Sequence, residues 1–159
     1  AQPIISYNYG AKNVGRVKKA FWLLLKVSLS YAVLLWAFIM IFPQGFAGMF
    51  TSDPELLVFT KTALRIYTAC LFLFGIQMAC QMTFTSLGKA GSSIIVAVMR
   101  KFILLIPLIY IMPAILRENK AVAVYMAEPI ADFLAVTFTA ILFFFQFRKC
   151  LRQIEQKTF

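Results

Sequence analysis

The sequence contains no histidine, and only 6 of its 159 residues are Asp or Glu. The absence of histidine excludes imidazole-based metal sites and acid–base catalysis by this side chain. The three cysteines, Cys70, Cys80 and Cys150, are widely spaced and form no CxxC pair. Two lie in an apolar run and one in the basic tail, so we expect packing residues and one free thiol, with no disulfide and no metal site. Because a nucleophile motif and a metal set are both missing, no catalytic residues and no enzyme are expected.

Charge is also scarce. Charged residues make up 14% of the chain and hydrophobic residues 62%. A soluble domain is about 45–50% apolar, so this composition is typical of a membrane protein. The net charge of +10 could indicate nucleic-acid binding, but the basic residues cluster at the ends of apolar runs. Membrane topology explains that pattern better, so we expect lipid and not nucleic acid as a partner.

Four long apolar runs cover residues 20–42, 66–87, 94–116 and 121–147. The first run alone reaches roughly 35 Å as a helix, enough to cross a hydrocarbon core of about 30 Å. Runs this long with so few charges predict transmembrane helices. The predicted fold class is therefore an all-α membrane protein with four transmembrane helices and a basic tail over 148–159.

Basic residues predict the orientation of these helices. Those at the ends of the runs are Lys12, Arg16, Lys18, Lys19, Lys89, Arg148, Lys149, Arg152 and Lys157. The connection after the first run begins with a stretch that lacks Lys and Arg and carries Asp53 and Glu55. By the positive-inside rule, both chain ends and the Gly88–Ser93 loop are cytoplasmic. We therefore expect a multi-pass protein of the plasma (inner) membrane.

Several local signals accompany the runs. Ser52 and Glu55 have the spacing of a capping box around Pro54, so the second helix should begin ahead of its apolar run. Trp22 and Trp36 lie towards opposite ends of the first run, where amphipathic rings favour the membrane interface.

Amide side chains mark one face of the second run. Gln77 and Gln81 are four residues apart, and Thr85 continues the same stripe. They could form the wall of a polar cavity that contacts substrate. Hydrogen bonding between helices, which is common in bundles, is the alternative.

The fourth run contains an acidic pair. Glu128 and Asp132 share one helix face on either side of Pro129, and Tyr125 joins them. Two neighbouring carboxylates suit proton binding or the attraction of a cationic substrate. Alternatively, Glu128 is hydrated near the outer interface and Asp132 pairs with a basic or hydroxyl neighbour.

Two features of the third run are structural or gating candidates. Arg100 and Lys101 lie about two turns inside the helix, where snorkelling to the interface is the ordinary explanation. Pro107 removes a backbone donor and should kink the helix. Kinked helices suit gating but are also common in static bundles.

Several segments together resemble the carboxy-terminal part of a multidrug and toxic compound extrusion (MATE) transporter. They are Gln2–Asn13 followed by Arg16 and Val17, Phe50–Asp53, Ser86–Ala90, Arg100 ahead of Ile106–Leu108, and Glu128–Asp132. The resemblance implies twelve helices in two six-helix lobes around a central cavity, which exchange a proton or sodium ion for an organic, often cationic, substrate. On that plan the four runs are similar to helices nine to twelve.

The resemblance also implies what accompanies this chain. Gln2–Tyr9 looks like the end of a further helix, the eighth, which Gly10 and Asn13 would end. The expected partners are then a missing amino-terminal lobe and a small organic substrate. Some sodium-coupled members use an aspartate on helix ten, but the second run offers Gln77 and Gln81 and no acid. Because of this departure, the site for the coupling ion, a proton or sodium, could lie in the missing lobe. No cofactor is expected.

The leading hypothesis is therefore an ion-coupled efflux antiporter that works by alternating access. Its candidate cavity residues are Gln77, Gln81, Tyr125, Glu128 and Asp132. One alternative is a lipid-linked saccharide flippase of related architecture, which would favour a large basic cavity. Another is a four-helix membrane protein with a structural role and no transport activity.

Overall fold

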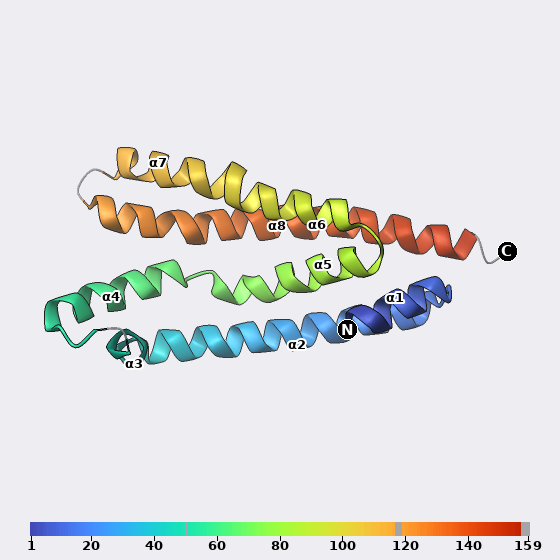
Figure 1. Cartoon of the computed structure of the whole chain (residues 1–159), viewed down its shortest axis with the longest axis horizontal. Helices are drawn as coiled ribbons and strands as arrows, with labels where there is room; N and C mark the ends of the chain where they lie inside the picture. The colour runs from blue at the N-terminus through green and yellow to red at the C-terminus, as the bar shows by residue number, and fades with distance from the viewer. Residues whose placement is uncertain (50, 117–118, 157–159) are drawn as a thin grey trace.

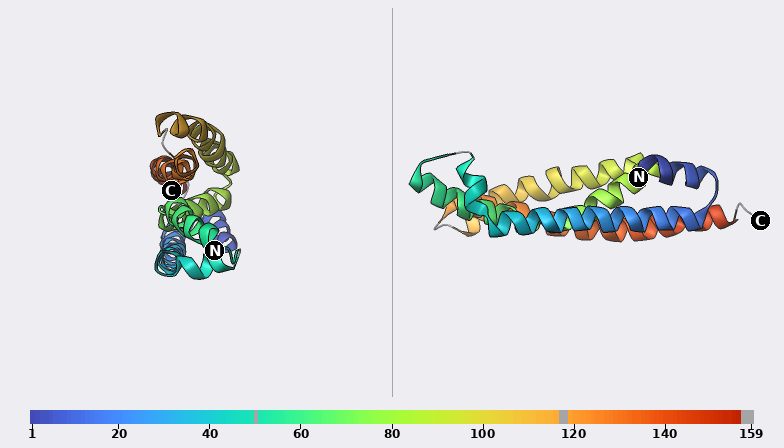
Figure 2. Two further views of the ribbon diagram at one scale, coloured as in Figure 1. Left: turned by 90° about the vertical axis from the view of Figure 1, so that its left-hand side faces the viewer. Right: turned by 90° about the horizontal axis from the view of Figure 1, so that it is seen from below.

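The computed structural model of the chain describes residues 1–49, 51–116 and 119–156, apart from the side chain of residue 155. These residues form an elongated helical bundle with no strand among them (Figure 1). The elements are α1 (Gln2–Gly10), α2 (Val14–Ile41), α3 (Pro43–Gly48), α4 (Pro54–Tyr67), the short 3-10 helix η1 (Leu71–Leu73), α5 (Phe74–Ser86), α6 (Ala90–Val98), the π-helix η2 (Met99–Leu105), α7 (Ile106–Ile115) and α8 (Lys120–Gln156). Seen from its end, the bundle is narrow in cross-section (Figure 2).

Among the described residues, three helices are each long and apolar enough to cross a membrane. They are Val14–Ile41, Ala90–Ile115 and Lys120–Ile154. Helix α4 and Leu71–Ser86 meet the same test together, as a pair bent by 40°, and we take this pair as the fourth crossing segment. The predicted all-α membrane fold is confirmed, and the second crossing segment is a broken helix.

The break in the second crossing segment is held by α2. The indole Nε1 of Trp36 donates to the carbonyl oxygen of Ala69 over 3.1 Å, and its ring packs edge-on against Phe72. Arg65 donates to the carbonyl oxygen of Met40 over 3.2 Å. We expected the indole of Trp36 at a membrane interface. In the structure it donates to a backbone carbonyl that the interrupted helix leaves without its usual partner.

Asn13 begins α2 and does not end α1. Its side chain accepts a hydrogen bond from the backbone N–H of Arg16 at 3.1 Å, as an N-cap does. The preceding helix ends at Gly10 as predicted. The left-handed residue of this turn is Lys12, with φ 56°, and the N–H of Asn13 reaches back to the carbonyl of Asn8. This is a Schellman turn with lysine where glycine is usual.

A second Schellman turn joins α5 to α6. Gly88 has φ 72°, its N–H bonds the carbonyl of Thr85, and the N–H of Lys89 bonds the carbonyl of Phe84. The predicted end of the second run at Gly88 is confirmed.

The residue that caps the start of α4 differs from the one predicted. The side chain of Asp53, and not of Ser52, accepts from the backbone N–H of Glu55 at 2.9 Å. Pro54 then occupies the first helical position, where its missing N–H costs nothing.

Two adjoining apolar clusters hold α1, α2, α5 and α8 together at the end of the bundle where α8 finishes. The rings of Phe21 and Phe143 stack with their centroids 4.7 Å apart. Cys80 and Cys150 are buried in these clusters and Cys70 is half-buried. None of the three forms a disulfide, as predicted, but Cys150 of the tail is itself a buried packing residue.

Helices α2 and α5 approach each other closely at Gly75. A Cβ atom at this position would lie 2.7 Å from the Cα of Leu29 and 2.7 Å from the carbonyl oxygen of Ser28. Both of these are backbone atoms, so only glycine allows this packing.

Candidate functional site

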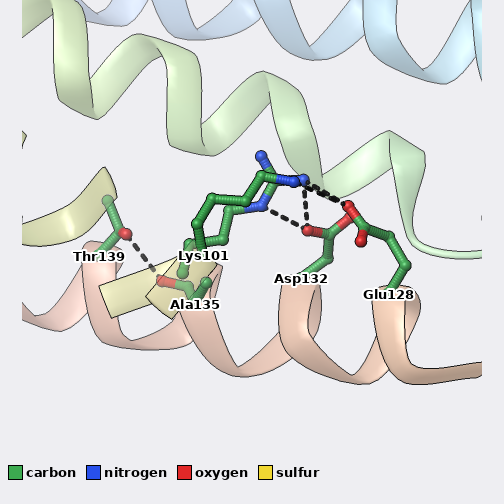
Figure 3. A network of polar contacts seen from close by, with 6 residues as sticks. Lys101, Glu128, Asp132, Ala135 and Thr139 are labelled. Atoms are coloured by element: carbon green, nitrogen blue, oxygen red, sulfur yellow. Dashed lines mark hydrogen bonds and ion pairs between the residues drawn. The ribbon is translucent and has the colours of Figure 1, made fainter. Parts of the chain in front are cut away.

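An ion-pair cluster joins the third crossing helix to the fourth. Nε of Arg100 donates to Oδ1 of Asp132 over 2.6 Å, and Nη2 donates to Oε1 of Glu128 over 3.2 Å. The ammonium of Lys101 lies 3.5 Å from the same Glu128 oxygen. Figure 3 shows Glu128 and Asp132 rising from neighbouring turns of α8 towards these cations. We call these four residues the ion-pair cluster.

Local backbone geometry places the four side chains. Glu128 and Asp132 are four apart and so share a face of α8, which continues unbroken through Pro129. Arg100 and Lys101 lie in the π-helix η2. Because a π-helical turn holds more residues than an α-helical turn, two consecutive side chains can reach the same neighbouring helix.

Pro107 lies just beyond this π-helix, in the first turn of α7. Its missing N–H therefore falls where the hydrogen-bonding pattern changes from π to α. The helix from Ala90 to Ile115 still runs as one crossing segment. The kink at Pro107 stays a prediction, and the irregularity that the structure shows beside it is the π-helix on its amino-terminal side.

The ion-pair cluster is well enclosed and formally neutral. The side chains of Arg100, Asp132 and Glu128 are 16%, 12% and 10% exposed. Lys101 is half-exposed, at 51%. Charges in a membrane-spanning helix are costly unless they pair, and here two cations meet two carboxylates. The snorkelling interpretation is therefore wrong for Arg100, and the pairing of Asp132 with a basic neighbour is confirmed.

The second crossing segment also reaches the cluster. The guanidinium carbon of Arg100 lies 5.3 Å from the ring centroid of Phe74, the first residue of α5. Such a contact is a cation–π interaction, which strengthens away from water. Further out, the ring of Tyr125 packs edge-on against Phe59 of α4, with centroids 6.1 Å apart. Tyr125 therefore sits one turn before Glu128 and links α8 to α4.

The glutamine face of α5 continues from Phe74. Gln77 and Gln81 follow it at three and seven residues, which keeps all three on one side of the helix. Gln81 donates to the carbonyl of Ser93 on α6 at 3.5 Å. Gln77 is only 2% exposed, and its Oε1 has no hydrogen-bond partner among the described residues. One glutamine thus bonds between helices, and the other presents a buried unpaired oxygen.

Two further polar residues, which join α6 to α8, were not predicted from the sequence. The hydroxyl of Ser92 on α6 donates to Oε1 of Gln146 on α8 over 2.8 Å. The signal was available, because Gln146 is the single amide in the predicted fourth run. Gly10, a predicted structural or gating residue, lies at the end of α1 and is not among these polar residues. The polar groups therefore follow α5, the third crossing helix and α8 where these three meet.

Comparison with known proteins agrees with this architecture. The MatE family model matches residues 1–111. The FAD transporter of Shewanella oneidensis is 27% identical over 106 residues, which make up 67% of this chain and 24% of that protein.

Solved structures match almost the whole chain. The MATE multidrug transporter DinF-BH has a TM-score of 0.82 at 34% identity, over 90% of this chain and 31% of its own. The Vibrio cholerae MATE transporter VcmN, in its bent form, has a TM-score of 0.80 at 18% identity, over 98% of this chain and 34% of its own.

The chain thus spans about a third or less of the length of the relatives it matches. The family model covers residues 1–111 of the 159, well over half of the chain. With its helical membrane fold, this match means that the chain belongs to the MatE family, whose members are transporters and not enzymes.

Proposed function

We propose that this chain is part of the carboxy-terminal lobe of an ion-coupled antiporter, which exports organic and often cationic small molecules by alternating access. The coupling ion is a proton or sodium, and the protein works in the plasma (inner) membrane with both ends of this segment in the cytoplasm. The similarity to a multidrug transporter and to an FAD transporter supports a small organic substrate. The observation that carries the proposal is the ion-pair cluster.

The ion-pair cluster can respond to an added cation because its two positive and two negative charges already compensate each other. Arg100 donates to two carboxylates, and these bonds are strong because both partners are charged. A proton taken up by Asp132, or an organic cation that competes for it, weakens the attachment of Arg100 to α8 and leaves Glu128 as its remaining charged partner. Since Arg100 joins the third crossing helix to the fourth and also contacts Phe74, a weaker attachment changes the packing of three crossing segments at once.

Gln77 supplies a neutral contact for substrate or water. A buried amide oxygen without a partner is costly, typically about 1–3 kcal/mol. A transporter can retain such a group when a ligand or water satisfies it during the cycle. We therefore assign Gln77 and Gln81 to the polar wall of this lobe, together with Tyr125, Glu128 and Asp132.

The test uses the full-length protein in everted membrane vesicles, with export of a fluorescent cationic dye measured under an imposed pH or sodium gradient. Asp132→Asn is expected to lower gradient-driven export by roughly tenfold or more, within the range of typical coupling energies. Glu55→Gln is the matched control, because it neutralises an exposed carboxylate in the first turn of α4. Unchanged export and unchanged ion dependence in Asp132→Asn would remove the cluster from the mechanism.

A further inference from the structure

A groove of about 640 Å³ lies between α2, α5 and α8, at the end of the bundle where α2 begins and α8 finishes. Its lining includes three basic residues, Lys18, Arg148 and Arg152. Apolar side chains, among them Trp22, Ile76 and Phe144, make up most of the rest. We call this feature the basic groove.

The basic groove is divided into a charged end and an apolar end. On α2 the lining passes inward from Lys18 to Leu25, a rise of about 10 Å at about 1.5 Å per residue. On α8 it passes inward from Arg152 through Arg148 to Ala140, a rise of about 18 Å. The cations therefore lie towards the end of the bundle, and the apolar lining continues towards its middle.

The positive charge of the groove is not balanced by the described side chains around it. No Asp or Glu is among the lining residues, and the three cations form none of the salt bridges found in the described residues. Arg148 instead lies over the ring of Phe144, 5.2 Å from its centroid. This differs from Arg100 and Lys101, whose charges are both met by carboxylates.

Part of the apolar lining of the groove is exposed in this segment of the protein. Trp22 and Phe144 are 57% and 55% exposed, and they come from the two helices that form its walls. A ligand that satisfies both ends must carry an anionic head and a long apolar chain. Basic pockets between transmembrane helices are known to bind anionic lipid head groups.

We infer that the basic groove binds an anionic glycerophospholipid. Its phosphate lies among Lys18, Arg148 and Arg152, and an acyl chain follows the apolar lining past Trp22, Ile76 and Phe144. Because the groove is formed by α2, α5 and α8, the bound lipid ties together the beginning of the first crossing helix and the end of the fourth. The inference depends on the membrane fold and not on which substrate is exported.

The experiment is native mass spectrometry and thermal unfolding of the delipidated full-length protein in detergent. Phosphatidylglycerol, phosphatidylcholine and glycerol phosphate are added in parallel. Phosphatidylglycerol should remain bound and raise the unfolding temperature, whereas the zwitterionic lipid and the head group without chains should do neither. Equal binding of phosphatidylcholine would show that the groove recognises only the acyl chains. Equal binding of glycerol phosphate would show that it recognises only the anion. Either result overturns the inference.

The matching variant carries Lys18→Gln, Arg148→Gln and Arg152→Gln. At about 1 kcal/mol for each cation, it should bind phosphatidylglycerol roughly 100-fold more weakly. The control carries Arg16→Gln, Lys19→Gln and Lys89→Gln, which remove the same charge from the same end of the bundle outside the groove. A similar loss in the control would show that general surface charge, and not this groove, attracts the lipid.

Discussion

Arg100 and Asp132 lie on different membrane-crossing helices, and Nε of the first is 2.6 Å from Oδ1 of the second. The bond joins η2 to α8, and Glu128 and Lys101 complete the cluster. Removing one partner of a buried pair leaves the other charge without compensation. That loss is typically larger than the net gain from forming the pair.

We expect Arg100→Gln to destabilise the full-length protein by about 3 kcal/mol, because two enclosed carboxylates lose their main donor. Combining it with Asp132→Asn should recover part of this loss, since one uncompensated charge is removed. The measurement is thermal unfolding in detergent of both single variants and the double variant. Strictly additive effects would contradict the coupling between these residues.

Gly75→Ala should destabilise the contact between α2 and α5 by about 1–3 kcal/mol, since the new methyl group meets the backbone at Ser28 and Leu29. Gly91→Ala is the control, because no atom lies within 4 Å of a Cβ placed there and α6 gains a better helix former. Unfolding temperatures of the two variants should move in opposite directions. An equal response would contradict the close approach.

Gly88→Ala should cost about 1–2 kcal/mol, because the turn between α5 and α6 requires a left-handed residue there. Gly10→Ala should be tolerated, since Gly10 has an ordinary helical backbone and open space around it. The comparison of the two glycines by thermal unfolding separates turn geometry from a general preference for alanine.

Trp36→Phe keeps an aromatic ring against Phe72 but removes the donor to the Ala69 carbonyl. We expect a loss of about 0.5–1.5 kcal/mol, the usual net value of one hydrogen bond. Hydrogen exchange should show faster opening of the backbone around residues 68–73. Trp22→Phe, on the exposed side of the same helix, should leave that region unchanged.

Gln77→Met replaces a buried amide by an apolar side chain of similar length. Because the Oε1 of Gln77 has no partner among the described residues, unfolding stability should be unchanged or higher. Dye export in vesicles should nevertheless fall, if the amide contacts substrate as proposed. A large loss of stability with a normal export rate per folded molecule would assign Gln77 a structural role only.

The number of crossing segments could be predicted from the sequence because it depends on the length and apolarity of each run. The break after Tyr67 could not, since residues 68–73 contain neither proline nor glycine. The interruption depends on contacts from a distant helix, such as the bond from Trp36 to Ala69. Local sequence carries no record of that contact.

The candidate site, too, could be predicted from the sequence only in part. The shared face of Glu128 and Asp132 follows from their spacing on one helix. Their pairing with Arg100 depends on the register between two helices and on the π-helix that turns Arg100 towards α8. Spacing alone therefore located the acids but assigned Arg100 to the membrane interface.

The ion-pair cluster has a consequence for how the protein is made. A fourth helix that entered the bilayer alone would carry two carboxylates, each at a cost of about 2.5–3.5 kcal/mol near the centre of the membrane. The third helix carries the two cations that neutralise them, and only a short connection separates Ile115 from Lys120. We therefore expect the ribosome to deliver these two helices to the translocon as one hairpin, with the charges already matched before either helix meets lipid.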